Sequence, residues 1–322
     1  MGIFTKLTKR EITAVLGNFP GIEKQQFLAE GVAMGTVNTF YRLHFPTTNK
    51  VYYLKIDELN DETRLKNECL ILRTLEKKSA NLSFKIPVPL KTHRGLDYLD
   101  DGNRFTLVFP EITGRSLFGR ELRPKHLTLV GEKLAELHQI IPDPRLQPHR
   151  FDRTGLKATY TEIQNALFKK HPQIAKFVEA KLNTLLAAEP RRYKSAIIHA
   201  DLFPENILWV KNSFSGMLDF EAAGSGHPLF DVAVGLHALC HNGVNFEPNL
   251  CQSMLDGYAR KQKLSSSDLK LTRYYLELTA LRFLLTRLRD FELKNISPQT
   301  SNFKDYREFI KRFEELKAFT FS

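Results

Sequence analysis

Side chains able to do acid, base or metal chemistry gather between Ser195 and Ala233. They are His199, Asp201, Asn206, Asp219 and Asp231. Short apolar runs at 196–198, 207–210 and 216–220 predict three strands separated by loops. Asp201 and Asn206 then share the first loop, five positions apart, and Asp219 lies where the third strand ends. The pattern H-x-D-x-x-x-x-N followed by D-F is typical of a phosphoryl-transfer site.

The residue types suit that chemistry. A hydroxyl that attacks phosphorus needs a carboxylate to orient it and to accept its proton, which is a role for Asp201. Mg²⁺ prefers oxygen ligands and keeps several waters, so Asn206 and Asp219 would suffice together with the phosphates of a nucleotide. Such a site acts by positioning and charge neutralisation, and it requires no covalent step of the protein.

Other interpretations apply to single residues of this set. An isolated loop Asp is usually a turn former or a cap, and only the joint spacing favours phosphoryl transfer. A zinc site is the other alternative, but His227 is the only further ligand type at a suitable spacing. His199 either orients the loop backbone or contacts substrate. Asp231 follows Pro228 at the start of an apolar helical run, where we expect a structural carboxylate that accepts backbone N–H bonds.

The stretch resembles the catalytic core of the aminoglycoside phosphotransferase and choline kinase superfamily, which are small-molecule relatives of the protein kinases. H-A-D-L-F-P-E-N at 199–206 and A-L-R-F-L-L-T-R-L at 280–288 resemble the homoserine kinase branch in particular. The resemblance covers nearly the whole chain and implies that Asp201 is the catalytic base and that Asn206 and Asp219 are Mg²⁺ ligands. Homoserine kinases tend to continue D-F-Y-F-A, whereas this chain has D-F-E-A-A-G, and 302–322 matches poorly. The acceptor is therefore less well defined than the phosphotransfer machinery.

A lysine and a glutamate upstream fit the same scheme. Residues 51–56 are predicted to be a strand that carries Lys55, and 60–78 a helix that carries Glu68. In kinases a strand lysine bridges the α- and β-phosphates and is held by a glutamate of the next helix. Without the downstream core, a surface lysine and a solvated glutamate would be the simpler interpretation. Gly31 and Gly35, in a predicted hairpin, could let backbone N–H groups approach phosphates, although a plain hairpin turn is equally compatible.

Further site residues follow from the resemblance and from the expected substrate. The strand at 104–109 ends in P-E-I-T-G, which looks like the hinge of a two-lobed kinase, and the backbone from Phe109 to Glu111 would then meet adenine. An amino-acid acceptor needs an anion for its ammonium and a cation for its carboxylate. Glu221 and Arg282 are the candidates. The alternatives are a solvent-facing glutamate and an arginine paired with a neighbouring helix.

Composition limits the remaining classes of function. With 322 residues, of which 42% are hydrophobic, the chain can form one large domain or two. The net charge of +11 suits nucleic-acid binding or a phosphate-handling enzyme, and acids interleaved among the basic residues favour the enzyme. Three scattered cysteines without C-x-x-C spacing indicate reduced thiols and a cytoplasmic location. The most apolar later stretch, 274–285, contains charges, so we expect no membrane span.

We therefore predict an α+β, two-lobed protein-kinase-like fold. Residues 1–110 would form a nucleotide-binding lobe, an antiparallel sheet with a helix, and 111–322 a mainly helical catalytic and substrate-binding lobe. The expected reaction is ATP- and Mg²⁺-dependent phosphorylation of a small-molecule hydroxyl, L-homoserine first. Rival predictions are the same reaction on choline, an amino sugar or a methylthio sugar, a catalytically silent kinase-like binding module, and nucleic-acid binding. The sequence leaves the oligomeric state open.

Overall fold

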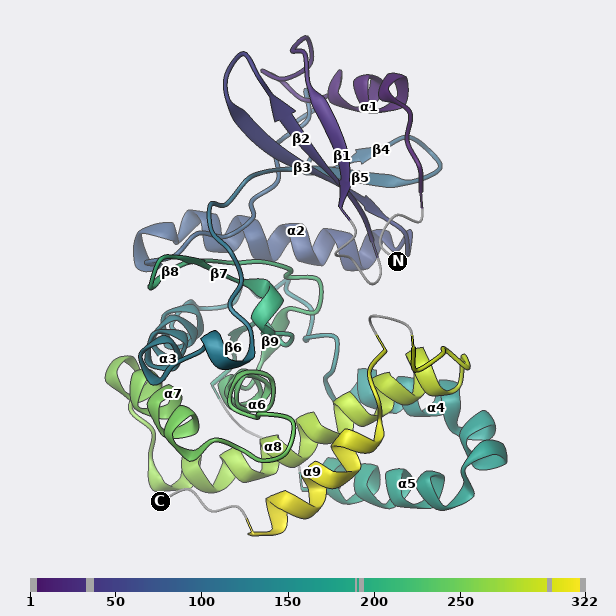
Figure 1. The fold of residues 1–322 in the computed structure, drawn as a ribbon, viewed down its shortest axis with the longest axis vertical. Helices are drawn as coiled ribbons and strands as arrows, with labels where there is room; N and C mark the ends of the chain where they lie inside the picture. The colour runs from purple at the N-terminus through teal and green to yellow at the C-terminus, as the bar shows by residue number, and fades with distance from the viewer. Residues whose placement is uncertain (1–4, 33–37, 189, 191–193, 300–302, 319–322) are drawn as a thin grey trace.

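A computed structural model describes residues 5–32, 38–188, 190, 194–299 and 303–318. Its N-terminal part is a five-stranded antiparallel sheet in the order β1-β2-β3-β5-β4. The strands are β1 (Leu28–Val32), β2 (Thr39–Phe45), β3 (Lys50–Asp57), β4 (Leu99–Asp100) and β5 (Phe105–Pro110). The sheet forms the upper part of the molecule in Figure 1, above a mainly helical lower part.

One helix lies on each side of this sheet. Strand β2 alternates buried and half-buried residues, as a strand covered chiefly on one face does. Helix α1 (Lys9–Leu16) begins with a capping box, in which Thr8 and Glu11 satisfy each other's backbone N–H groups. It packs with the sheet into a small apolar core. Helix α2 (Glu62–Lys77), capped by Asp61, lies between the sheet and the lower part of the molecule (Figure 1).

The connection after β5 joins the two parts through backbone pairing. Arg115 and Trp209 exchange N–H···O bonds of 2.9 Å, which places the connection against β7 (Ile207–Val210). At Gly114, with φ of 149°, an added Cβ would lie 2.9 Å from Leu208 Cβ. Strand β8 (Ser213–Met217) pairs with β7 and touches the segment that follows α2, where Lys85 N–H donates to Ser215 O at 2.9 Å.

The lower part is built from helices around two short strand pairs. The helices are α3 (Pro124–His138), α4 (Arg153–Lys170), α5 (Pro172–Ala187), α6 (Pro228–Leu239), α7 (Pro248–Lys261), α8 (Ser266–Arg287) and α9 (Arg307–Ala318). Helices α3 and α7 lie side by side in Figure 1 and approach closely at glycines. A Cβ on Gly131 would lie 2.0 Å from Met254 O, and one on Gly257 would lie 2.0 Å from Thr128 O.

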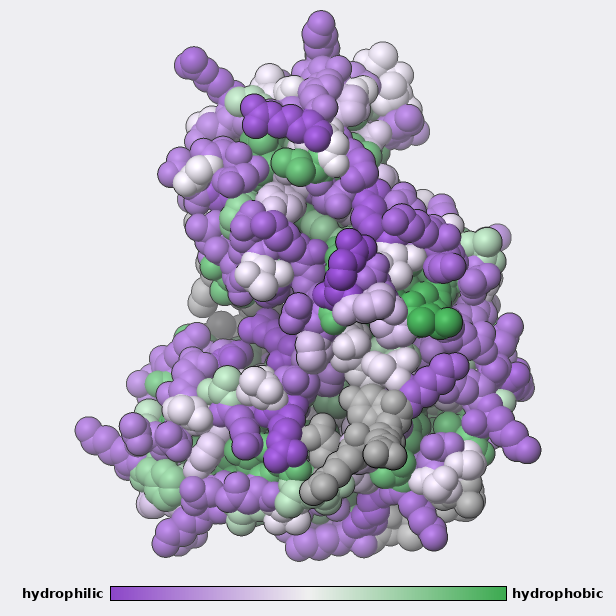
Figure 2. Space-filling model, turned by 180° about the vertical axis from the view of Figure 1, so that it is seen from behind, coloured by the Kyte–Doolittle hydropathy of each residue, from purple (hydrophilic) through white to green (hydrophobic). Residues whose placement is uncertain are grey.

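The apolar core does not divide at the predicted lobe boundary. One cluster lies under α1 and contains residues such as Phe19, Leu43 and Leu54. The larger cluster combines α2 and Leu107 with the helices of the lower part. Seen from behind, the surface is mostly hydrophilic and its outline is hollowed between the upper and lower parts (Figure 2). None of the described helices is long and apolar enough to cross a membrane.

The predicted strand of Lys55 and helix of Glu68 are present, and the predicted strand 216–220 ends earlier, at Met217. The segment after Pro87 stays irregular up to β4, which has only two residues, because turns occupy 93–98. Strand β9 (Gly224–Gly226) was not predicted. Its sequence, G-S-G, has no apolar pattern, and its pairing with β6 (Ala196–Ile198) comes from the tertiary structure.

Candidate active site

Lys55 and Glu68 form a buried ion pair between β3 and α2. Lys55 Nζ lies 3.0 Å from both carboxylate oxygens of Glu68, and the two side chains are 3% and 4% exposed. Burial alone would lower the pKa of Lys55, but the carboxylates of Glu68, Glu221 and Asp219 outweigh it and raise the pKa above its usual range. The lysine is thus a fixed cation, ready to meet the negative charge of phosphates.

Glu221 gives Lys55 a second anionic partner, from the lower part of the chain. Its Oε1 lies 2.7 Å from Lys55 Nζ, and its Oε2 lies 2.8 Å from Arg64 Nη1 on α2. Asn38, at the start of β2, also donates its side-chain amide to this carboxylate. The two cations hold the pKa of Glu221 below its usual range although burial opposes them. Glu221 therefore links the two parts of the molecule, and its predicted role of meeting an ammonium group stays a prediction.

The loop that carries Asp201 is held by a buried carboxylate. Strand β6 ends at Ile198, and Ala200 follows with a positive φ of 63°. The carboxylate of Asp231, on α6, accepts the N–H groups of His199 and Ala200 at 2.6 Å each. These bonds fix a left-handed conformation that costs energy for a residue other than glycine. Asp231 is structural as predicted. The N–H groups that donate hydrogen bonds to it, however, belong to the loop of Asp201 and not to the start of its own helix.

His138 completes this network, and the sequence interpretation did not include it. Its Nε2 lies 3.1 Å from Asp231 Oδ2, and its Nδ1 lies 2.9 Å from the hydroxyl of Tyr258. Burial acts to raise the pKa of Asp231, but the contacts of its carboxylate with His138 and with His199 outweigh burial and hold the pKa below its usual range. In the sequence, His138 is visible only as a histidine at the end of an apolar helical stretch. A histidine at such a position usually has no role beyond the helix terminus. Its partners lie more than ninety positions away, beyond the reach of a local pattern.

Asn206 and His199 tie the loop to the segment that carries Asp219. Asn206 lies in a short 3₁₀ turn (Pro204–Asn206) and donates Nδ2 to Asp201 O at 2.9 Å, while its own carbonyl accepts Leu218 N–H at 2.8 Å. His199 Nε2 lies 2.8 Å from Leu218 O. His199 therefore contacts backbone, which favours the orienting role over contact with substrate. The predicted set of residues is brought together around one loop.

Asn206 and Asp219 fit the predicted Mg²⁺ ligands. Because Asn206 uses its amide nitrogen on the loop, its side-chain oxygen is left to act as an acceptor. Asp219 has a positive φ of 63° and a solvent-accessible side chain. Partial loss of hydration, and then the charges of Glu221 and Asp201, raise its pKa, so a cation beside it would favour the ionised form. In the described ranges, no group of three or more His, Cys, Asp or Glu side chains could hold a metal alone.

The predicted nucleotide contacts of the upper part are only partly described. Gly31 lies on β1 opposite Tyr41, whereas Gly35 lies outside the described residues. Phe109 is on β5, opposite Tyr53 of β3. The backbone N–H of Glu111 donates to Val51 O at 3.0 Å, so a contact between Glu111 and adenine would use its carbonyl oxygen.

Arg282 lies against the predicted catalytic base. Its Nη2 donates to Asp201 Oδ1 at 2.5 Å, and its guanidinium is sandwiched by the rings of Phe151 and Phe283 at 3.8 and 4.2 Å. Arg282 comes from α8, within the stretch that resembles homoserine kinases. The arrangement places the guanidinium of Arg282, from the helical part, beside the loop of Asp201. The role of Arg282 in binding a substrate carboxylate stays a prediction.

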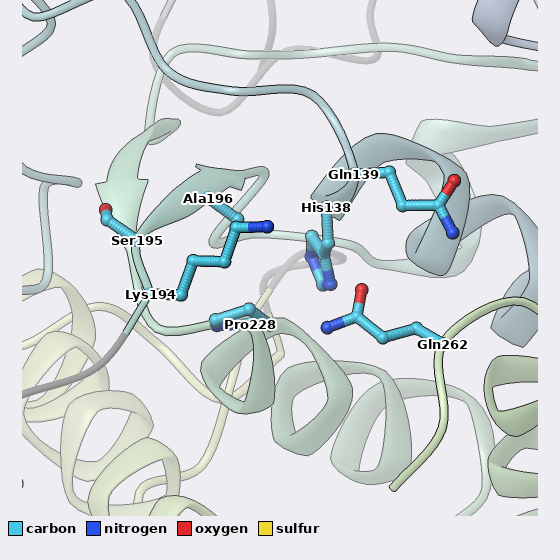
Figure 3. A pocket seen from close by; sticks show the side chains of 7 residues that line it. All are labelled: His138, Gln139, Lys194, Ser195, Ala196, Pro228 and Gln262. Carbon is cyan, nitrogen blue, oxygen red and sulfur yellow. The ribbon is translucent and has the colours of Figure 1, made fainter.

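A pocket of about 290 Å³ opens at the other end of β6 (Figure 3). Its lining residues are His138, Gln139, Lys194, Ser195, Ala196, Pro228 and Gln262. It begins before the first residue of β6, whereas the loop of Asp201 follows the last. The pocket therefore lies at the opposite end of β6 from the loop of Asp201, and its lining reaches the network of Asp231 at His138.

Solved structures define the class of fold. An amicoumacin kinase, in complex with AMP-PNP, Ca²⁺ and Ami, aligns with a TM-score of 0.71 over 97% of this chain and 94% of its own, at 17% identity. A spectinomycin phosphotransferase, with ADP and spectinomycin, aligns with a TM-score of 0.66 over 98% of this chain and 99% of its own, at 16% identity. The predicted two-lobed kinase-like fold is confirmed.

The family follows from the sequence itself. Residues 29–264 match the model of the phosphotransferase enzyme family, and the chain belongs to that family. It is 28% identical over 302 residues to a homoserine kinase of Chelativorans sp. (strain BNC1), which covers 90% of this chain and 88% of the relative. A homoserine kinase of Parvibaculum lavamentivorans is 24% identical over 97% of this chain and 95% of its own. The predicted enzyme class, a small-molecule phosphotransferase, is confirmed.

Proposed function

We propose that this protein transfers the γ-phosphoryl group of ATP to the hydroxyl of L-homoserine. The observation that carries the proposal is the buried Lys55–Glu68 pair, joined through Glu221 to the segment of Asp219. The choice of acceptor is supported by relatives named homoserine kinase that align along 90% or more of the chain. The product would be O-phospho-L-homoserine, an intermediate of threonine biosynthesis.

Each residue has a defined task in this reaction. Lys55, held by Glu68, binds the α- and β-phosphates of ATP. Asp201 orients the acceptor hydroxyl and takes its proton as the oxygen attacks the γ-phosphorus. Asn206 and Asp219 would hold Mg²⁺, which supplies neutralisation of phosphate charge when bound. His199 is a positioning residue that keeps the loop against the segment of Leu218.

The division of labour between the lobes is part of the same proposal. Residues 1–110 would bind the nucleotide, with Gly31, Gly35 and the backbone from Phe109 to Glu111 around it. Residues 111–322 would supply the base and the acceptor site, where Arg282 meets the carboxylate and Glu221 the ammonium group. The free cysteines Cys69, Cys240 and Cys251 are buried, which supports a cytoplasmic location for the enzyme.

The test is ADP release from purified protein with ATP and Mg²⁺ across a panel of small alcohols and amino alcohols. We expect strong turnover with L-homoserine, and a loss of kcat of about 100-fold or more in Asp201→Asn, since a general base contributes on that scale. The control is Glu162→Gln, on the surface of α4. Preference for choline or an amino sugar would replace the acceptor, and near-normal kcat in Asp201→Asn would contradict the mechanism.

A further inference from the structure

One carboxylate binds two cations at the boundary between the upper and lower parts of the molecule. Glu221 lies with its Oε1 2.7 Å from Lys55 Nζ and with its Oε2 2.8 Å from Arg64 Nη1. The two cations thus meet different oxygens of the same small anion. A phosphate group offers its negative oxygens to two cations in the same way. Lys55 has a predicted role at the nucleotide phosphates, whereas the sequence suggested no role for Arg64.

Helix α2 directs Arg64 to the same place as Glu68. Arg64 precedes Glu68 by four positions, so both side chains lie on one face of the helix. Asn67, one position before Glu68, donates its Nδ2 to Ala223 O at 3.4 Å. The face of α2 that carries Arg64 therefore meets the segment that follows Glu221 in the chain.

Each of the two cations also has a carboxylate partner within the upper part. Lys55 is paired with Glu68, and the guanidinium of Arg64 donates to the fully buried carboxylate of Asp57, at the end of β3. These pairs join β3 to α2 and do not depend on Glu221. Movement of Glu221 would therefore leave neither cation buried without a counter-charge, which would be costly.

Glu221 is the partner that a nucleotide can displace. The side chain of Lys55 is 3% exposed, so phosphates reach its Nζ only if a group that covers it moves. Glu221 is more exposed than Glu68, at 13% against 4%, and it lies in a turn between β8 and β9 (Gly224–Gly226). Its side chain can thus move without shifting a helix or a strand. The same movement frees Nη1 of Arg64.

We propose that Arg64 is a second phosphate-binding residue, and that Glu221 gives way to a phosphate group of ATP between Lys55 and Arg64. The inference rests on the proposed function for its use of a nucleoside triphosphate, and it holds for any acceptor. A guanidinium binds phosphate oxygens through directed N–H bonds. Asp57 keeps Arg64 anchored while Nη1 turns from the carboxylate to the phosphate.

Nucleotide binding tests this proposal in the absence of an acceptor. In Arg64→Gln the dissociation constant of AMP-PNP with Mg²⁺, measured by calorimetry, should rise by about tenfold or more, the scale of one hydrogen bond to a charged group. The dissociation constant of adenosine, which has no phosphates, should change by less than about twofold. Lys66→Gln removes the same charge from the exposed side of α2 and is the matched control. Equal losses for AMP-PNP and adenosine, or no loss for either, would overturn the proposal.

Two further variants separate phosphate binding from a purely structural arginine. Arg64→Lys keeps the charge without the planar fork, so it should recover part of the AMP-PNP affinity that Arg64→Gln loses. Glu221→Gln removes the charge that competes with phosphates, and it should bind AMP-PNP severalfold more tightly than the wild type. An Arg64→Lys variant that binds as weakly as Arg64→Gln would show a structural arginine. Weaker binding in Glu221→Gln would contradict the displacement.

The two proposals fail in different ways. Turnover of L-homoserine with AMP-PNP affinity that does not depend on Arg64 contradicts only the role of Arg64. Affinity that depends on Arg64, without turnover of any alcohol of the panel, contradicts only the proposed function. An absence of AMP-PNP binding to the wild type contradicts both. If thermal unfolding shows that Arg64→Gln does not fold, the affinities of Arg64→Lys and Glu221→Gln decide.

Discussion

The imidazole of His138 lies 3.1 Å from the carboxylate of Asp231, the same carboxylate that accepts hydrogen bonds from the backbone N–H groups at the start of the loop of Asp201. Both side chains are fully buried. Asp231 thus transmits the position of helices α3 and α6 to the loop of Asp201 without any contact with the reacting groups.

Asp231→Asn should impair the loop more than the nucleotide site. The amide has one acceptor oxygen for two backbone N–H groups, and its NH₂ faces a donor, so the unfolding free energy should fall by about 3 kcal/mol. We expect kcat to drop about tenfold or more while KM for ATP changes little. Tyr258→Phe, which removes only the hydroxyl that contacts His138, is the control and should cost about 1 kcal/mol. Steady-state kinetics with thermal unfolding measure both effects, and an unchanged kcat would contradict the positioning role.

Replacing Lys55 should damage stability as well as nucleotide use. Its charge compensates the carboxylates of Glu68 and Glu221 in a buried environment, so Lys55→Met leaves like charges together and should cost about 3–5 kcal/mol. Glu68→Gln keeps Lys55 paired with Glu221, and should raise KM for ATP with a smaller loss of stability. Denaturant unfolding and ATP titrations distinguish the two variants. Equal stability of Lys55→Met and wild type would mean that the pair is solvated.

Acid should destabilise the protein between about pH 6.5 and 4. Burial lowers the pKa of His149 to about 4, with the positive charge of Arg282 adding to the shift and Asp231 opposing it. Above pH 6.5 the imidazole is neutral in both states and contributes nothing. Below it the unfolded chain binds a proton that the folded protein does not, so unfolding is favoured by up to about 1.4 kcal/mol per pH unit for one such histidine. Denaturant unfolding across this range should show a shallower slope in His149→Gln; an identical slope would contradict the assignment.

The close contact of α3 and α7 should not tolerate a methyl group. In Gly257→Ala the new Cβ would overlap Thr128 O, a backbone atom that cannot move without shifting α3. We expect a loss of about 3 kcal/mol or more, or a failure to fold. Gln252→Ala, on the exposed side of α7, is the control and should change stability by less than about 0.5 kcal/mol. Thermal unfolding of the two variants gives the comparison.

The sequence predicted the parts of the site whose signals are local. The strand of Lys55 and the helix of Glu68 were recognised because their periodicity and caps are local, and the structure pairs these two residues at 3.0 Å. Asp201, Asn206 and Asp219 were grouped by spacing on one loop and the strand end that follows. Their chemical roles stay predictions, because they depend on substrates as well as on geometry.

What could not be predicted depends on distant partners. The ion pairs of Glu221 with Lys55 and Arg64 join positions more than 150 residues apart, and nothing near Glu221 indicates them. The same is true of Arg282 and Asp201, 81 positions apart. The role of His138 was missed for that reason, since burial and two distant hydrogen-bond partners make a helix-end histidine part of the support for the loop.

If Lys55 binds phosphates as proposed, Glu221 makes nucleotide binding an exchange of anions. Lys55 and Arg64 are already neutralised by its carboxylate, so phosphates that reach Lys55 replace one negative partner by another. Such a site would gain less affinity than a bare cationic site, and Lys55 would keep Glu68 as a partner throughout and regain Glu221 when ADP departs. The returning carboxylate competes with the departing product, which favours rapid turnover over tight retention of nucleotide.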